Sequence, residues 1–166
     1  MKTRQAIVLV SVACLIVILV LASLGLESAR HFNRRTTCRN QLRAITFVIR
    51  LFAEDHQGAF PHSLSGLAPT YVNDPELFRC SDTLTTLGSM TNVDQWMDYI
   101  YIHWDQGIRT PTNFPLMFDR RVSNHQWKGI NIVRVDGSVL WDVRGQWLRA
   151  FANEHPDLRL PLPEGM

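Results

Sequence analysis

The sequence predicts an α+β protein in which a long N-terminal helix, with a transmembrane half and an amphipathic half, packs on a small antiparallel β-sheet. Three observations lead to this fold class. An uncharged apolar run fills residues 6–26, a helical repeat of apolar residues follows it, and short segments separated by Pro, Gly, Asn and Asp make up the rest. At 166 residues the chain has room for one domain plus an anchor, because a single hydrophobic core serves about 100–150 residues.

The apolar run is predicted to be a membrane anchor. As a helix, residues 6–26 would extend about 31 Å, which matches a hydrocarbon core of about 30 Å. A cleaved signal peptide is the alternative, since Lys2 and Arg4 precede the run and Ala22-Ser23 offers small residues near its end. The run is longer than the about 7–15 apolar residues usual in signal peptides. This length favours a retained anchor.

The predicted helix continues beyond the membrane. No proline occurs before Pro61, and Gly25 is the sole glycine before Gly58, so we expect one helix from about Ala6 to Asp55. Its second half repeats apolar residues at helical spacing, and a β-sheet should cover this stripe. The stripe consists of Cys38, Leu42, Ile45, Ile49 and Phe52. The expected segments are an anchor at 1–27, an amphipathic stem at 28–57, a head domain at 58–155 and a loosely held tail at 156–166.

Three segments of the head are predicted to contribute strands. Met97–Trp104 alternates and is rich in Tyr and Ile, and Pro115–Asp119 is predicted as an edge strand because proline cannot donate to a ladder. Gly129–Val143 contains two apolar runs joined by Asp136-Gly137, which suits a two-residue type I′ hairpin.

A two-residue turn would fix the register of this hairpin and the face on which each side chain lies. It would pair Ile132 with Trp141 and Ile130 with Val143. The face expected against the helix stripe then holds Ile130, Ile132, Val139, Trp141 and Val143. The opposite face, with Val133, Val135 and Leu140, would be covered by Trp147, Leu148 and Phe151.

Basic residues concentrate near the apolar run. Residues 1–50 contain eight of the 17 Lys and Arg residues but one of the 15 Asp and Glu residues, Glu27. Arginines after the run outnumber Lys2 and Arg4 before it, which by count favours a cytoplasmic C-terminal side, although large domains translocate largely regardless of flanking charge. The same arginines could contact anionic lipid headgroups, and no nucleic-acid partner is expected.

Two strings of residues resemble pilin-like proteins of the type II secretion pseudopilin group. The first runs from Cys38 to Ile45 and continues through Phe52–Pro61, and the second runs from His125 to Val139. The positions that carry the resemblance are Asn40, Leu42, Gly58, Pro61, His125, Gly129, Asp136 and Gly137. Together the matches span residues 38–143 and imply a pilin-like fold.

The resemblance implies a membrane-anchored scaffold subunit associated with a type II secretion or type IV pilus-like system. Such a subunit would be a single-pass protein of the inner (cytoplasmic) membrane with its C-terminal domain in the periplasm. Its expected partners are other pilin-like subunits or the secretion machinery, together with membrane lipid. The alternative is a membrane-tethered extracytoplasmic recognition module with the same fold.

The start of the apolar run departs from the family pattern. Prepilins carry a glycine at the cut site, followed by a glutamate, whereas Gln5-Ala6-Ile7 occupies this place and no acidic residue precedes Glu27. We therefore expect that prepilin peptidase does not trim the chain and that its N-terminus lies at Met1 or Lys2.

Cys38 and Cys80 are candidates for a disulfide, because both lie in the part expected outside the cytoplasm, where thiols oxidise. The alternative is that Cys38 is a buried helix residue and Cys80 a loop thiol.

No catalytic residue is predicted, and the chain is not expected to be an enzyme. His125 could act with Asp119 and Asp136 in acid–base chemistry, as a secreted hydrolase would require, but the turn already explains Asp136. No nucleophile motif, His-x-x-x-His spacing or phosphate loop occurs. No cofactor is expected; Asp119, Asp136 and Asp142 offer oxygen donors that suit calcium, without a spacing that defines a ligand set.

Overall fold

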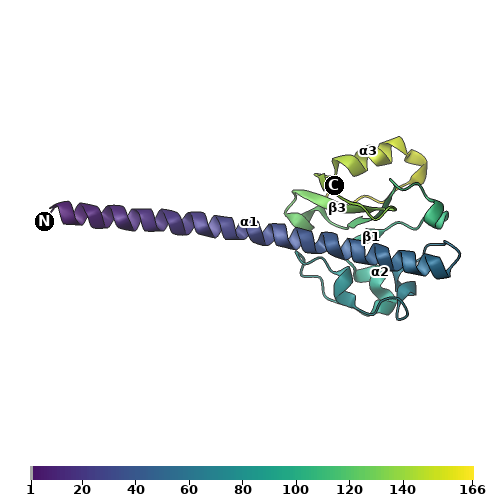
Figure 1. Ribbon diagram of the computed structural model, residues 1–166. Helices are drawn as coiled ribbons and strands as arrows, with labels where there is room; N and C mark the ends of the chain where they lie inside the picture. The colour runs from purple at the N-terminus through teal and green to yellow at the C-terminus, as the bar shows by residue number, and fades with distance from the viewer. Residues whose placement is uncertain (1) are drawn as a thin grey trace. The chain divides into compact units, whose positions relative to one another are not determined.

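The computed structural model describes the backbone of residues 2–166 and the side chains of residues 12 and 14–166. Met1 and the side chains of Lys2, Arg4 and Gln5-Ala6-Ile7 therefore lie outside the described residues, and the expectation for the N-terminus stays a prediction. The elements are α1 (Lys2–Asp55), α2 (Val93–Trp96), β1 (Tyr99–Tyr101), β2 (Pro115–Asp119), β3 (Gly129–Arg134), β4 (Val139–Val143) and α3 (Gln146–Glu154). The long helix and the antiparallel sheet, in the order β1-β2-β3-β4, confirm the α+β class (Figure 1).

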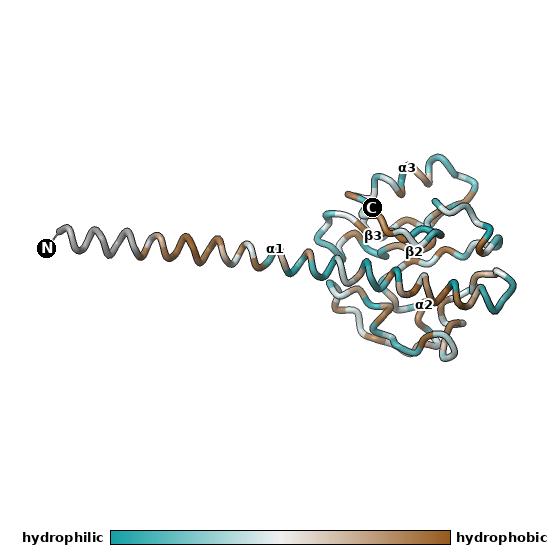
Figure 2. Tube along the Cα trace, in the orientation of Figure 1, coloured by the Kyte–Doolittle hydropathy of each residue, from teal (hydrophilic) through white to brown (hydrophobic). Residues whose placement is uncertain are grey.

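The chain forms two compact units, residues 1–33 and residues 34–166, and α1 belongs to both. In the first unit the apolar side chains are exposed; Leu15, Ile18 and Leu21, for example, are each between 57% and 62% accessible. The described part of this run is largely brown in Figure 2. It makes α1 long and apolar enough to cross a membrane. One such helix fits a single-pass anchor.

In the second unit, called the head unit below, α1 forms the wall of the main core. Four residues of the predicted stripe, Cys38, Leu42, Ile45 and Ile49, are fully buried, whereas Phe52 is half-buried and Ala53 occupies the next buried position. Residues of the sheet pack on one side of this part of α1, and the segment around α2 packs on the other (Figure 1). The helix is therefore covered on two sides by chain that follows it in sequence.

The β3–β4 hairpin has a different register from the predicted one. Ile130 pairs with Asp142 and Ile132 pairs with Leu140, one residue away from the expected partners. The cause is the turn. Of its residues Gly137 has a positive φ, at 82°, but Asp136 does not. Because a type I′ turn needs positive φ at both central residues, the loop instead contains three residues and closes with the Arg134 N–H donating to the Ser138 carbonyl.

A shift of one residue changes which side chains of β3 share a face with those of β4, so the predicted helix-facing set is wrong for Ile130 and Ile132 and right for Val139. Val133, Val135 and Val139 belong to the core that contains the α1 stripe. Ile130 and Ile132 face the other way and pack with Leu148 of α3 in a second cluster. As expected, α3 covers the face of the sheet that points away from α1. The β3 side chains that it covers are Ile130 and Ile132, not the predicted Val133 and Val135.

Two further expectations are corrected by the sheet and the tail. β2 is an interior strand between β1 and β3, not an edge strand, since Pro115 stands at its first position, where a missing N–H is tolerated. The tail is tied to the segment after β2, because the Glu164 N–H donates to the Arg120 carbonyl and the Glu164 carbonyl accepts from the Val122 N–H. It is therefore not loosely held.

The turn glycine provides a test of the backbone conformation at this turn. Gly137→Ala should lower the free energy of unfolding by about 1–2 kcal/mol, because an alanine at positive φ places its Cβ against the neighbouring carbonyl. The matched control is Gly66→Ala, where φ is not positive and nothing lies within 4 Å of the added carbon. Urea unfolding of the full chain in detergent would measure both. Equal stability of the two variants would contradict the assigned turn.

Candidate functional site

A buried histidine forms the centre of a polar cluster in the head unit. His125 ends the 3-10 turn Val122–His125, which follows β2, and Gln126 and Trp127 then take left-handed backbone angles with φ of 56° and 61°. This reversal of the chain leads directly into β3. The His125 side chain is only 4% exposed, so its ring must find its polar partners inside the protein.

Two carboxylates flank the imidazole ring of His125. Its Nδ1 atom lies 3.3 Å from Asp82 Oδ2, and its Nε2 atom lies 3.1 Å from Asp119 Oδ2. Asn131 completes the cluster by donating to Asp119 Oδ2 through its backbone N–H, at 2.6 Å, and through its side-chain amide, at 3.2 Å. The other carboxylate oxygen of Asp119, Oδ1, is buried without a hydrogen-bond partner among the described residues.

The electrostatics favour the charged form of His125. Burial by itself lowers the pKa of the imidazole, but hydrogen bonds and charge from Asp119, and then from Asp82, act in the opposite direction and raise the pKa above its ordinary value. Arg34 donates to Asp82 Oδ1 at 3.1 Å and adds a second cation. The cluster is thus a network of alternating charges, as buried ionised groups require.

A disulfide lies directly beside this cluster. It joins Cys38 of α1 to Cys80, with 5.2 Å between the two Cα atoms. Cys80 Sγ is 3.8 Å from His125 Nε2, and the Ser81 N–H donates to Cys38 Sγ at 3.2 Å. The helix, the loop after Cys80 and the sheet therefore meet at one place.

A second buried carboxylate holds the loop that follows Cys80. Asp98 is 1% exposed and accepts from the Cys80 N–H at 3.0 Å and from the Thr83 and Thr85 hydroxyls at 2.5 and 2.6 Å. Asp98, Asp82 and Asn131 were not predicted as site residues from the sequence. The available signal was the polar string Ser81-Asp82-Thr83 next to a cysteine.

The remaining motif positions have separate structural roles. Asn40 is exposed and Leu42 is core. The carbonyl of Gly58, in the turn that follows α1, accepts from the Ile108 N–H, and the Pro61 carbonyl accepts from the Tyr101 hydroxyl. Gly129 leaves no room for a side chain beside Trp141 and the Asp142 carbonyl. Of the predicted motif positions, His125 alone is part of the polar cluster.

The three aspartates considered for calcium bind different partners. Asp119 belongs to the His125 cluster, Asp136 accepts from Ser138 inside the hairpin turn, and Asp142 accepts the N–H groups of Trp147 and Leu148 at the start of α3. Asp136 is accordingly a turn residue and not an acid–base partner of His125.

Comparison with known protein families, curated proteins and solved structures finds no match for this chain. Its function has to be inferred from its own residues and contacts. Surface hollows of about 240, 310 and 260 Å³ occur in the head unit, and none of the three is lined by His125, Asp82 or Asp119.

The His125 network predicts a stability that depends on pH. Because the folded-state pKa is raised above 6.5, the stabilisation is complete below the unfolded-state pKa and is lost as pH rises through the folded-state pKa. The free energy of unfolding should therefore fall from pH 6 upward, and His125→Gln should remove this slope. Urea unfolding between pH 5.5 and 9 measures it, with His103→Gln as the control that leaves the cluster intact. An unchanged slope in His125→Gln would refute the assignment.

The disulfide predicts a loss of stability on reduction. Cys38 and Cys80 are 42 residues apart, and releasing a closed loop of this size should lower the free energy of unfolding by about 4 kcal/mol, largely through the entropy of the unfolded chain. Unfolding would be compared with and without a phosphine reductant, in the presence of a chelator. A Cys14→Ser background removes the free thiol. Identical curves would show that the bridge does not constrain the unfolded chain.

Proposed function

We propose that this chain is a pilin-like scaffold subunit, anchored in the inner membrane and associated with a type II secretion or type IV pilus-like system. The observation that carries the proposal is the dual character of α1. Its first part exposes an apolar surface suited to lipid, and its second part supplies the buried stripe of the head unit. A helix that combines both tasks is the design expected from the resemblance of residues 38–61 and 125–139 to pilin-like proteins.

The disulfide supports a periplasmic position for the head. Disulfides persist in oxidising compartments and are rare in the cytosol, and Cys38–Cys80 lies within the head unit. On this proposal the basic residues that follow the apolar run lie at the outer surface of the membrane, where they contact lipid headgroups.

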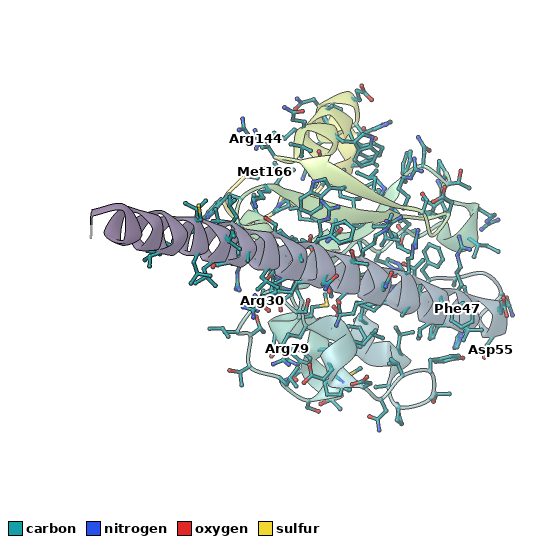
Figure 3. All side chains as sticks on the ribbon, turned by 60° about the vertical axis from the view of Figure 1, so that its left-hand side comes forward. Arg30, Phe47, Asp55, Arg79, Arg144 and Met166 are labelled. Carbon is teal, nitrogen blue, oxygen red and sulfur yellow. A yellow bond between two sulfur atoms is a disulfide. The ribbon has the colours of Figure 1, made fainter. Side chains whose placement is uncertain are left out.

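The proposed mode of action is contact with neighbouring proteins and not catalysis. His125 is buried, and its ring nitrogens already lie against Asp82 and Asp119, so no substrate reaches it without opening the core. By contrast, α1 carries exposed apolar surface within the head unit. Phe47 is 62% exposed (Figure 3), Ala44 is exposed on the same side, and Leu51, one turn further, is half-buried. A second pilin-like subunit is the partner we propose for this surface.

Crosslinking in native membranes tests the scaffold role. In a Cys14→Ser background, Phe47→Cys should give dimers and higher oligomers with a thiol crosslinker, in membranes first washed with alkaline carbonate. Leu84→Cys is the matched control, since Leu84 is fully exposed on a loop of the same unit, and it should give mainly monomer. Release of the chain by carbonate would contradict the anchor. Monomers alone from Phe47→Cys would instead favour a tethered recognition module.

A further inference from the structure

The bridged cysteines and His125 bring three metal-ligating atoms together. Cys38 Sγ, Cys80 Sγ and a ring nitrogen of His125 lie within 4.8 Å of one another, and all three residues are buried. Zinc binds thiolate sulfur at about 2.3 Å and imidazole nitrogen at about 2.0–2.1 Å, so tetrahedral ligands lie about 3.5–3.8 Å apart. The 3.8 Å between Cys80 Sγ and His125 Nε2 is close to the about 3.6 Å that these bond lengths give between a sulfur and a nitrogen ligand.

The groups around these atoms match the requirements of such a site. Asp82 lies at His125 Nδ1 and can hold the proton there, which directs the Nε2 lone pair toward Cys80, as carboxylates do behind metal-bound histidines. The Ser81 N–H and hydroxyl lie 3.2 and 3.5 Å from Cys38 Sγ. Hydrogen bonds of this kind favour a charged sulfur.

A fourth donor is also present. Asp119 Oδ2 lies 3.1 Å from His125 Nε2, the ring nitrogen that also lies 3.8 Å from Cys80 Sγ. Oδ1 of the same carboxylate is buried with no hydrogen-bond partner in the described part of the chain. A buried oxygen left in this state is costly in an apolar core, and a bound cation would satisfy it.

We propose that the reduced chain binds one zinc-class divalent cation through Cys38, Cys80 and His125, with Asp119 as the fourth ligand. A dithiol reductant supplies the two electrons and two protons that convert the disulfide to two thiols, and the reductant becomes a disulfide itself. Metal binding then releases both thiol protons to solvent, together with the Nε2 proton of His125 when the imidazole is charged. The bridge and the metal exclude each other, because the metal ligand is the thiolate.

The charges agree with this assignment. Two thiolates and the Asp119 carboxylate carry three negative charges, which a divalent cation reduces to one. Asp82 keeps its ion pair with Arg34. Bound metal would hold α1, the loop after Cys80 and the sheet together at the position that the disulfide occupies in the oxidised chain. Either the disulfide or the metal can therefore crosslink the head unit at this position.

Cobalt substitution tests the site directly. The full chain, in detergent and with Cys14→Ser, would be reduced with a phosphine and titrated with Co²⁺. The reduced chain should take up one equivalent, with thiolate charge-transfer absorption and the strong visible bands of tetrahedral Co²⁺, and Zn²⁺ should abolish both. The oxidised chain should show neither the charge-transfer absorption nor the visible bands of tetrahedral Co²⁺. A reduced chain without charge-transfer absorption would overturn the proposal.

Variants distinguish the ligands from the surroundings. In competition with a chromophoric chelator, Asp82→Asn should weaken Zn²⁺ binding about 10–100-fold, as expected for a group behind a ligand, and His125→Ala should weaken it further. His103→Ala, a half-buried histidine outside the cluster, should bind as the parent does. Unchanged affinity in Asp82→Asn and His125→Ala would refute the site. If His125→Ala does not fold, Asp82→Asn alone decides.

Discussion

The fold depends on burying one stripe of α1. Leu42, Ile45 and Ile49 are fully removed from solvent, and each such side chain contributes about 1.5–3 kcal/mol when it leaves water. A single helix cannot bury its own apolar face, so the chain that follows has to cover it. The sheet does so from one side and the segment around α2 from the other. α3 then covers the far face of the sheet in a second, smaller cluster.

A polar junction fixes where these layers meet. The apolar stripe is compatible with several positions of the covering chain, because hydrophobic burial is non-directional. The Cys38–Cys80 bridge and the Asp82–His125–Asp119 contacts are directional. Breaking a buried ion pair by removing one partner leaves an uncompensated charge and is strongly destabilising. The cluster therefore selects one arrangement, whether the sulfurs bind each other or a metal.

The proposed scaffold role agrees with which side chains are buried and which are exposed. Chemistry at His125 would require an accessible ring, whereas this ring has been enclosed between two carboxylates. An accessible apolar residue of the head unit, Phe47, instead lies on α1, the helix that also provides the apolar run. The junction at Cys38 lies close to the beginning of the head unit.

The sequence by itself determined the apolar run, the continuous helix and the buried stripe. Each of these can be predicted from the local spacing of apolar residues and from the lack of Pro and the scarcity of Gly in this segment. It also located β2, β3 and β4. Only the tertiary structure decided the hairpin register, since Asp136-Gly137 fits both a two-residue and a three-residue loop and the choice decides which side chains of β3 share a face with those of β4. The partners of His125 were likewise beyond the sequence. Asp82 lies 43 positions away, and a contact across that distance leaves no periodic pattern, because the packing of the sheet on α1 alone brings the two residues together.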